Sequence, residues 1–275
     1  MSAVVRRSSA MRHIPQQTDG LFSGHRIDTS RPGAIDRITD GVRKRGLVTL
    51  TGIDSRTDAL ALAAQIMTVI PHRDSDSDGI TTIRDTRRHT HRAGFAGFGN
   101  GPLEPHTERS GSPSPPRLMM LVCGQAAHAG GDSVLVDGRA VHADLVTGAR
   151  AAASALAQPR SAYFGAGDGH PSQVFTIYDD DQVAVRLRLD GLARFSPIVQ
   201  PYLPTLRAAI ARHQLLMPMA PGQGYVLDNR RWLHARTAFT GSRVCWRALG
   251  EPRFAMSHGF IPQLAAQAAP ALVGP

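Results

Sequence analysis

The sequence predicts a mostly β fold with some helices, organised as a double-stranded β-helix (jelly roll) core with helical buttresses. Many short apolar runs, several of them rich in Val and Leu, are separated by turn residues. The few segments with helical spacing do not alternate regularly with these runs, which argues against a doubly wound parallel sheet. We expect a loose N-terminal segment over residues 1–31, because it is polar and rich in Gly and Pro, and a single domain over residues 32–275.

Four segments are expected to be helical. Residues 34–45 have apolar residues at helical spacing and end before Gly46, a residue type common after helix ends. The next expected helix is SRTDALALAAQIMTVI, residues 55–70, in which Ser55 and Asp58 form a pattern similar to a capping box. Two further helices are predicted over residues 141–156 and 202–216.

Strands account for most of the remaining chain. The runs QVFTIY and QVAVRLRL, joined by Asp179, Asp180 and Asp181, predict a hairpin. Residues 71–105 are rich in Asp, Arg, Gly and His and are expected to form loops around short strands. The other predicted strands are residues 47–52, 117–123, 133–138, 224–229, 230–236 and 243–250.

Composition excludes several classes of protein. The net charge is +9, but the basic residues are spread along the chain and all except Lys44 are arginines, so we expect no nucleic-acid partner. Cys123 and Cys245 lie far apart in apolar stretches, which fits a reducing compartment and not a disulfide framework. No leader with an apolar core and no long apolar run is present, so we expect a cytoplasmic protein without membrane association.

The motif EPHTERSG suggests a metal site. His106 and Glu108 are two residues apart, so on an extended segment their side chains project to the same face. A third ligand must come from elsewhere, and His234 in DNRRWLHAR is the strongest candidate because a jelly roll can bring a late strand beside an early one. Two imidazoles and one carboxylate form the facial set of non-haem Fe(II) oxygenases, which leaves positions open for a bidentate co-substrate and O2.

Three segments together resemble the taurine dioxygenase and clavaminate synthase-like family of Fe(II)- and 2-oxoglutarate-dependent oxygenases. The segments are EPHTERSG, PPRLMMLVCGQAAHAGGDSVLVDG and DNRRWLHARTAFTGSRVCWRALGEP, and the likeness extends over about residues 47–253. The resemblance implies that His106, Glu108 and His234 are the catalytic iron ligands. The H-x-E form of the motif is similar to the clavaminate synthase and amino-acid hydroxylase branch.

The resemblance also implies roles for residues outside the triad. Arg243 matches the arginine that pairs with the distal carboxylate of 2-oxoglutarate, and Ser133 stands where the family often has a threonine that helps to hold this carboxylate. A guanidinium suits this task because it presents a planar fork and stays charged. Arg247 matches an arginine that binds the substrate's carboxylate, Arg109 is a candidate substrate contact, and Arg236 is expected to support the site.

The function that this resemblance implies is hydroxylation of an unactivated C–H bond in an amino acid or a derived small molecule, in secondary metabolism, with release of succinate and CO2. The substrate is either free or tethered to a carrier protein, and the oligomeric state is left open. The retained Glu108 argues against halogenation, whereas desaturation and cyclisation stay open. Alternatives are an enzyme acting on a sulfonate or another carboxylate, an inactive jelly-roll binding protein and a nucleic-acid-associated protein. The pair His89 and His91 is interpreted as a surface or entrance feature.

Overall fold

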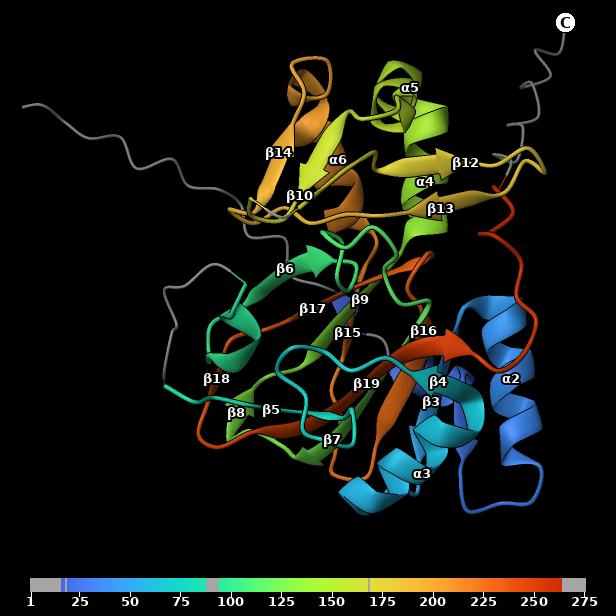
Figure 1. Ribbon diagram of the computed structural model, residues 1–275, viewed down its shortest axis with the longest axis vertical. Helices are drawn as coiled ribbons and strands as arrows, with labels where there is room; N and C mark the ends of the chain where they lie inside the picture. Colours follow the sequence, from blue (N-terminus) through green and yellow to red (C-terminus); the bar gives the residue numbers. More distant parts are fainter. Residues whose placement is uncertain (1–15, 18, 88–93, 168, 264–275) are drawn as a thin grey trace, which may run out of the picture.

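Two β-sheets form the centre of the computed structural model, which describes residues 16–17, 19–87, 94–167 and 169–263 (Figure 1). The smaller sheet has the strand order β1-β15-β9-β17-β6, and the larger has β2-β3-β16-β7-β19-β4, with β5 also paired to β19. Leu135 of the smaller sheet packs with Tyr225 and Leu249 of the larger one in a shared apolar core. The strands of the smaller sheet are β1 (Gln16–Gln17), β15 (Gln214–Met217), β9 (Ser133–Asp137), β17 (Trp232–Arg236) and β6 (Leu103–His106). Those of the larger are β2 (Arg26–Asp28), β3 (Leu47–Thr51), β16 (Gly224–Asp228), β7 (Leu118–Gln125), β19 (Val244–Pro252), β4 (Met67–Val69) and β5 (Thr81–Arg84).

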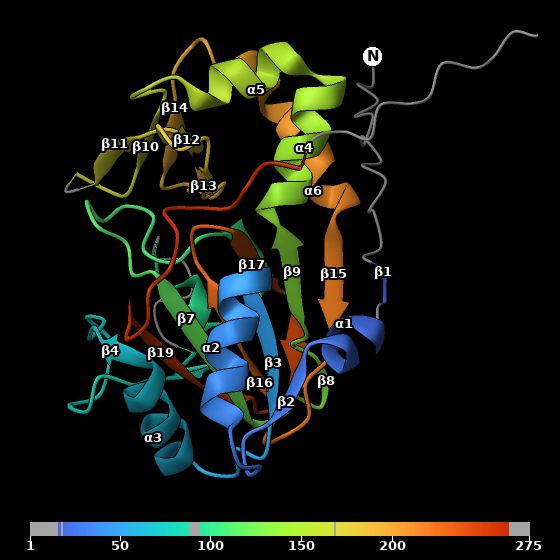
Figure 2. The same cartoon turned by 90° about the vertical axis from the view of Figure 1, so that its right-hand side faces the viewer.

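Two helices cover the outer face of the larger sheet (Figure 2). They are α2 (Ala34–Arg45), which agrees with the predicted segment, and α3 (Arg56–Ile66). Helix α3 is shorter than the segment expected to be helical, because residues 67–69 pair with β19 as strand β4. Helix α2 ends at Gly46, whose φ of 66° is the left-handed conformation that glycine adopts easily. The predicted capping box at α3 is confirmed, because Ser55 and Asp58 bond to each other's backbone N–H groups.

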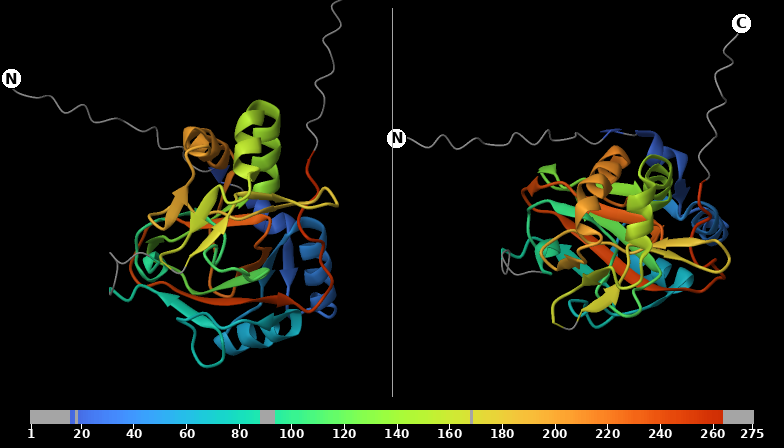
Figure 3. Two further views of the ribbon diagram at one scale, coloured as in Figure 1. Left: turned by 45° about the horizontal axis from the view of Figure 1, so that its top comes forward. Right: turned by 90° about the horizontal axis from the view of Figure 1, so that it is seen from above.

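A third layer lies above the sheets and has its own apolar core (Figures 1 and 3). The predicted hairpin is confirmed within it, since Phe175 pairs with Val185 and Ile177 with Val183. Its helices are α4 (Gly138–Gly148), α5 (Arg150–Ala157) and α6 (Leu203–Arg212), and its strands are β10 (Ala162–Phe164), β11 (His170–Ser172), β12 (Phe175–Ile177), β13 (Val183–Val185) and β14 (Ala193–Phe195). The remaining elements are α1 (Asp19–Gly24), η1 (Ala96–Phe98), η2 (Gln200–Tyr202), β8 (Ala129–Gly130) and β18 (Phe239–Thr240).

Three further expectations differ from the structure. Residues up to Arg31 were expected to be loose, but α1 and β2 are regular elements, and β2 pairs in parallel with β3 and buries Ile27. The helix expected over 141–156 is two helices, because Ala149 leaves the helical conformation with φ −152° and ψ 57°. The helix expected over 202–216 ends at Arg212, and residues 214–217 pair with β9 as strand β15. Within the described residues, no helix has the length and apolar character needed to cross a bilayer.

A buried ion pair holds the turn between β16 and β17. Arg117 donates to both carboxylate oxygens of Asp228, at 2.7 and 2.8 Å, and both side chains are nearly inaccessible to solvent. Because Asp228 precedes Asn229 and the β17 strand that carries His234, this pair fixes the approach to the candidate site.

We expect Arg117→Met to destabilise the fold by about 3–5 kcal/mol, since it leaves the Asp228 carboxylate buried without its partner. Urea unfolding of the metal-free protein measures this change. The matched control is Arg212→Met, which removes the half-exposed pair with Asp144 and should cost less than about 1 kcal/mol. Equal, small effects of both variants would contradict the structural role of the buried pair.

Candidate metal centre and cavity

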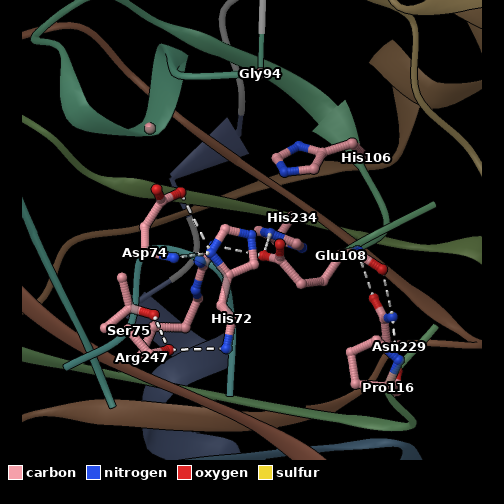
Figure 4. A network of polar contacts seen from close by, with 12 residues as sticks. His72, Asp74, Ser75, Gly94, His106, Glu108, Pro116, Asn229, His234 and Arg247 are labelled. Carbon is pink, nitrogen blue, oxygen red and sulfur yellow. Dashed lines mark hydrogen bonds and ion pairs between the residues drawn. The ribbon is translucent and has the colours of Figure 1, made fainter. Parts of the chain in front are cut away.

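His106, Glu108 and His234 converge at one point between the sheets. His106 at the end of β6 lies directly opposite His234 of β17, and their ring centroids are 4.2 Å apart. Glu108 follows β6, and its Oε2 lies 3.6 Å from His234 Nε2. One ligand atom of each residue lies within 4.8 Å of the other two, and Figure 4 shows the three side chains directed toward one another. The three predicted ligands are therefore brought together.

The protonation states in this cluster suit metal binding. Burial and the neighbouring His234 lower the pKa of His106 to about 4, so its imidazole is neutral at physiological pH. His106 Nδ1 lies 2.8 Å from the carbonyl oxygen of Glu104; if it donates there, Nε2 is left as a free acceptor. Burial raises the pKa of Glu108, but the positive charge of Arg247 and the hydrogen bond to His234 outweigh this, so the pKa stays well below its usual range. The buried His234 Nδ1 has no partner among the described residues.

The side chain of Asn229 holds the backbone of Glu108 in place. Its Oδ1 accepts from Glu108 N–H at 2.7 Å, and its amide donates to the carbonyls of Glu108 and Pro116 at 3.0 and 2.8 Å (Figure 4). Between the ligands, Thr107 faces the other way and bonds through its backbone and hydroxyl to Leu187. This alternation explains why His106 and Glu108 share one face.

The cluster lies in a cavity of about 830 Å³. This volume is in the range of small-molecule sites. Six arginines and three carboxylates contribute to its lining, so the cavity favours anionic ligands. Besides the triad, the lining includes the predicted residues Arg109, Ser133, Arg236, Arg243 and Arg247.

Arg243 is buried in the cavity wall, just before β19. Its guanidinium carbon lies 5.9 Å from the centre of the Phe239 ring, which is cation–π range. Gly131, with φ 79°, leaves the space that its aliphatic chain occupies, since a β-carbon there would come within 2.8 Å of Arg243 Cδ. Despite a register shift between Val244 and Cys245, Arg243 and Arg247 line the same cavity.

Tyr225 is a cavity residue that the sequence analysis missed. It projects from β16 of the larger sheet, is 1% exposed, and its hydroxyl is hydrogen-bonded to the side chain of Ser133 on β9 of the smaller sheet. Burial raises the pKa of the Tyr225 phenol, which therefore stays protonated. The continuous apolar run GYVL gave no sign of which strand face points inward.

Arg247 contacts one of the three candidate metal ligands directly. Its Nη1 donates to Glu108 Oε2 at 2.8 Å, while its buried Nε has no partner among the described residues. His72, from the loop between β4 and β5, also lines the cavity, and its Nδ1 accepts from the backbone N–H of Asp74 at 3.2 Å. Burial and the charge of Arg247 lower the pKa of His72, so this ring is a neutral donor through Nε2.

Arg236 and Arg109 differ in their surroundings. Arg236 donates to the carbonyls of Gly97, Gly99 and Gly101, which precede β6, so it supports the segment that leads to His106. Arg109 is half-buried and adopts the left-handed φ of 50° immediately after Glu108. His89 and His91, interpreted above as an entrance feature, lie outside the described residues.

Comparison with known proteins identifies the family of this chain. The model of the family "Taurine catabolism dioxygenase TauD, TfdA family" matches residues 12–249. Similar solved structures include an asparagine oxygenase with Fe(II), 2S,3S-3-hydroxyasparagine and succinate (TM-score 0.65, 18% identity, 80% of this chain and 79% of that chain covered). Another is the non-haem iron oxygenase OrfP with Fe, succinate and (3S)-hydroxy-L-Arg (TM-score 0.61, 15% identity, 80% of this chain and 83% of that chain covered). A third is PvcB from Pseudomonas aeruginosa (TM-score 0.60, 14% identity, 82% of this chain and 84% of that chain covered). With the family model matching most of its length, the chain belongs to the TauD/TfdA family of Fe(II)- and 2-oxoglutarate-dependent dioxygenases.

Proposed function

We propose that this enzyme hydroxylates an unactivated C–H bond of an amino acid or an amino-acid-derived small molecule. The observation that carries the proposal is the convergence of His106, Glu108 and His234 in one cavity with Arg243 and Arg247. Two similar structures hold hydroxylated amino acids, and this likeness supports the same substrate class here. The retained carboxylate Glu108 favours hydroxylation over halogenation.

The triad would hold Fe(II) through two imidazole nitrogens and one carboxylate oxygen. When bound, the iron and 2-oxoglutarate supply the oxidising chemistry: O2 and the keto acid are consumed, succinate and CO2 are released, and one oxygen atom enters the substrate. The protein's contribution is to bind the metal, the co-substrate and the substrate and to orient them. Neutral His106 and ionised Glu108 are ready to bind metal without first losing a proton.

Arg243, Ser133 and Tyr225 are positioned to hold the distal carboxylate of 2-oxoglutarate. Arg243 supplies a charged fork. In the hydrogen-bonded pair of Ser133 and Tyr225 hydroxyls, one group donates to the other, which leaves one proton free to donate to a carboxylate oxygen. All three side chains are buried, so each of these hydrogen bonds is shielded from competing water.

Arg247 and His72 face the substrate side of the metal cluster. The unpartnered Arg247 Nε and the Nε2–H of His72 are donors that an incoming carboxylate would satisfy. A sulfonate would satisfy the same donors, so an enzyme acting on a sulfonate or another carboxylate is the second candidate function. The inactive binder is disfavoured because no member of the metal cluster has been lost.

Anaerobic Fe(II) and 2-oxoglutarate are expected to give the weak visible charge-transfer band of a chelated keto acid. His234→Ala should abolish the band, and Arg243→Gln should raise the half-saturating 2-oxoglutarate concentration about 10- to 100-fold, since a charged hydrogen-bond pair contributes about 1.5–3 kcal/mol. Arg160→Gln, at an exposed arginine outside the cavity, is the control. Absence of any band at saturating co-substrate would contradict the proposed function.

Tyr225→Phe is expected to raise the half-saturating 2-oxoglutarate concentration about 3- to 10-fold, because it removes one neutral hydrogen bond of about 0.5–1.5 kcal/mol and keeps the ring. The same visible band measures this shift. Tyr178→Phe, in the hairpin turn after β12, is the matched control and should bind 2-oxoglutarate as the wild type does. An unchanged affinity in Tyr225→Phe would limit Tyr225 to a structural role.

A further inference from the structure

Two of the six cavity arginines, Arg109 and Arg243, form no ion pair or side-chain hydrogen bond with the described residues, and of these two only Arg109 is left without a role in binding the co-substrate. Arg188 pairs with both carboxylate oxygens of Asp190, Arg73 pairs with Asp74, and Arg247 pairs with Glu108. Arg236 donates to backbone carbonyls, and Arg243 is the group assigned to the co-substrate. In the described part of the chain, no ion pair or side-chain hydrogen bond involves the Arg109 guanidinium, although it lines the cavity.

The backbone at Arg109 is unusual for its residue type. Its φ of 50° lies in the left-handed region that side chains other than Asn and Asp rarely adopt. Such strain is kept where the surrounding structure imposes it and is concentrated at functional sites. Here the neighbours impose it: Glu108 is held by Asn229, the Arg109 carbonyl accepts from Ser112 N–H at 2.9 Å, and Gly111 packs against the Phe164 carbonyl.

Arg109, Arg247 and His72 line the same cavity. The charges of both arginines lower the pKa of His72, after the larger effect of its burial. Arg247 lies against the metal ligand Glu108, whereas Arg109 follows it in sequence. The charges of bound Fe(II) and of the 2-oxoglutarate dianion are equal and opposite. Their binding therefore leaves unchanged the net positive charge that results from more arginines than carboxylates in the cavity lining.

We infer that the substrate carries two anionic groups, a carboxylate bound by Arg247 and a second anionic oxygen group bound by Arg109. The inference rests on the proposed function and makes it more specific. The substrate class is thus an acidic amino acid or a derivative with a side-chain carboxylate, sulfonate or phosphate. A neutral amino acid would leave the Arg109 guanidinium without a partner in a partly desolvated cavity, which weakens its binding.

Binding measurements on metal-loaded protein test this inference without turnover. The protein is loaded with Mn(II) and 2-oxoglutarate without O2, and calorimetry compares each anionic probe with its neutral counterpart. The pairs are L-glutamate and L-glutamine, L-aspartate and L-asparagine, and O-phospho-L-serine and L-serine; L-cysteate represents the sulfonates. We expect at least one anionic probe to bind at least 10-fold more tightly than its counterpart, and the preferred pair identifies the source of the anion.

Arg109→Gln should reduce this preference to less than about 2-fold while the affinity for the neutral counterpart stays within 3-fold of the wild type. Arg109→Lys should retain part of the preference. The matched control is Arg160→Gln, because Arg160 is also an arginine with left-handed φ, at 58°, but is exposed and outside the cavity. Thermal unfolding of each variant verifies that it is folded.

Two results would overturn the inference: no anionic probe binds more tightly than its neutral counterpart, or Arg109→Gln keeps the full preference. The charge-transfer band separates these results from failure of the proposed function. A wild-type protein that chelates 2-oxoglutarate but shows no anion preference contradicts only the second anion site. A protein without the band contradicts the oxygenase function itself.

Discussion

The pairing of β6 with β17 is the constraint on which the candidate site depends. It places His106 directly opposite His234, so the strand pairing itself brings together two candidate ligands that are far apart in sequence. The third ligand lies beyond the end of β6, where no strand partner fixes it, and Asn229 takes over that task by binding both backbone groups of Glu108. Asn229 lies in the turn that begins β17, so the same turn aligns His234 and Glu108. The buried pair of Arg117 and Asp228 holds this turn against the core.

Arginine suits this cavity because a guanidinium stays charged where burial makes an imidazole neutral. Burial lowers the pKa of His106 and His72, so both imidazoles are neutral and suit the proposed roles of metal ligand and hydrogen-bond donor. A guanidinium stays charged in the same surroundings and binds carboxylates through two parallel hydrogen bonds. Arg243, just before β19, and Arg247, within it, thus give the cavity wall fixed positive charge. This division suits the proposed binding of an acidic co-substrate and an acidic substrate in one cavity.

Much of the site could be predicted from the sequence because its residues follow local rules. The H-x-E spacing gives two side chains on one face, and the apolar segment around His234 predicts a strand. Tyr225 could not be predicted, since a strand that is buried on both faces has no polar alternation to show which face meets the cavity. The end of α6 could not be predicted either, because Leu215 and Leu216 were expected to continue the helix. Only their pairing with β9 makes them part of a strand. Residues 26–28 are similarly polar in sequence, with Ile27 alone buried.

The contacts proposed for co-substrate and substrate come from different kinds of structure. Ser133, Tyr225 and Arg243 are fully buried and project from or next to strands of both sheets, where paired backbones and the shared core fix their positions. His72 and Arg109 lie instead on loops that follow β4 and β6 and are only half-buried. Loops tolerate substitution better than paired strands, because fewer packed neighbours depend on them. In the proposed arrangement, the paired strands orient metal and co-substrate, while loop residues such as Arg109 and His72 set the charge that the substrate meets.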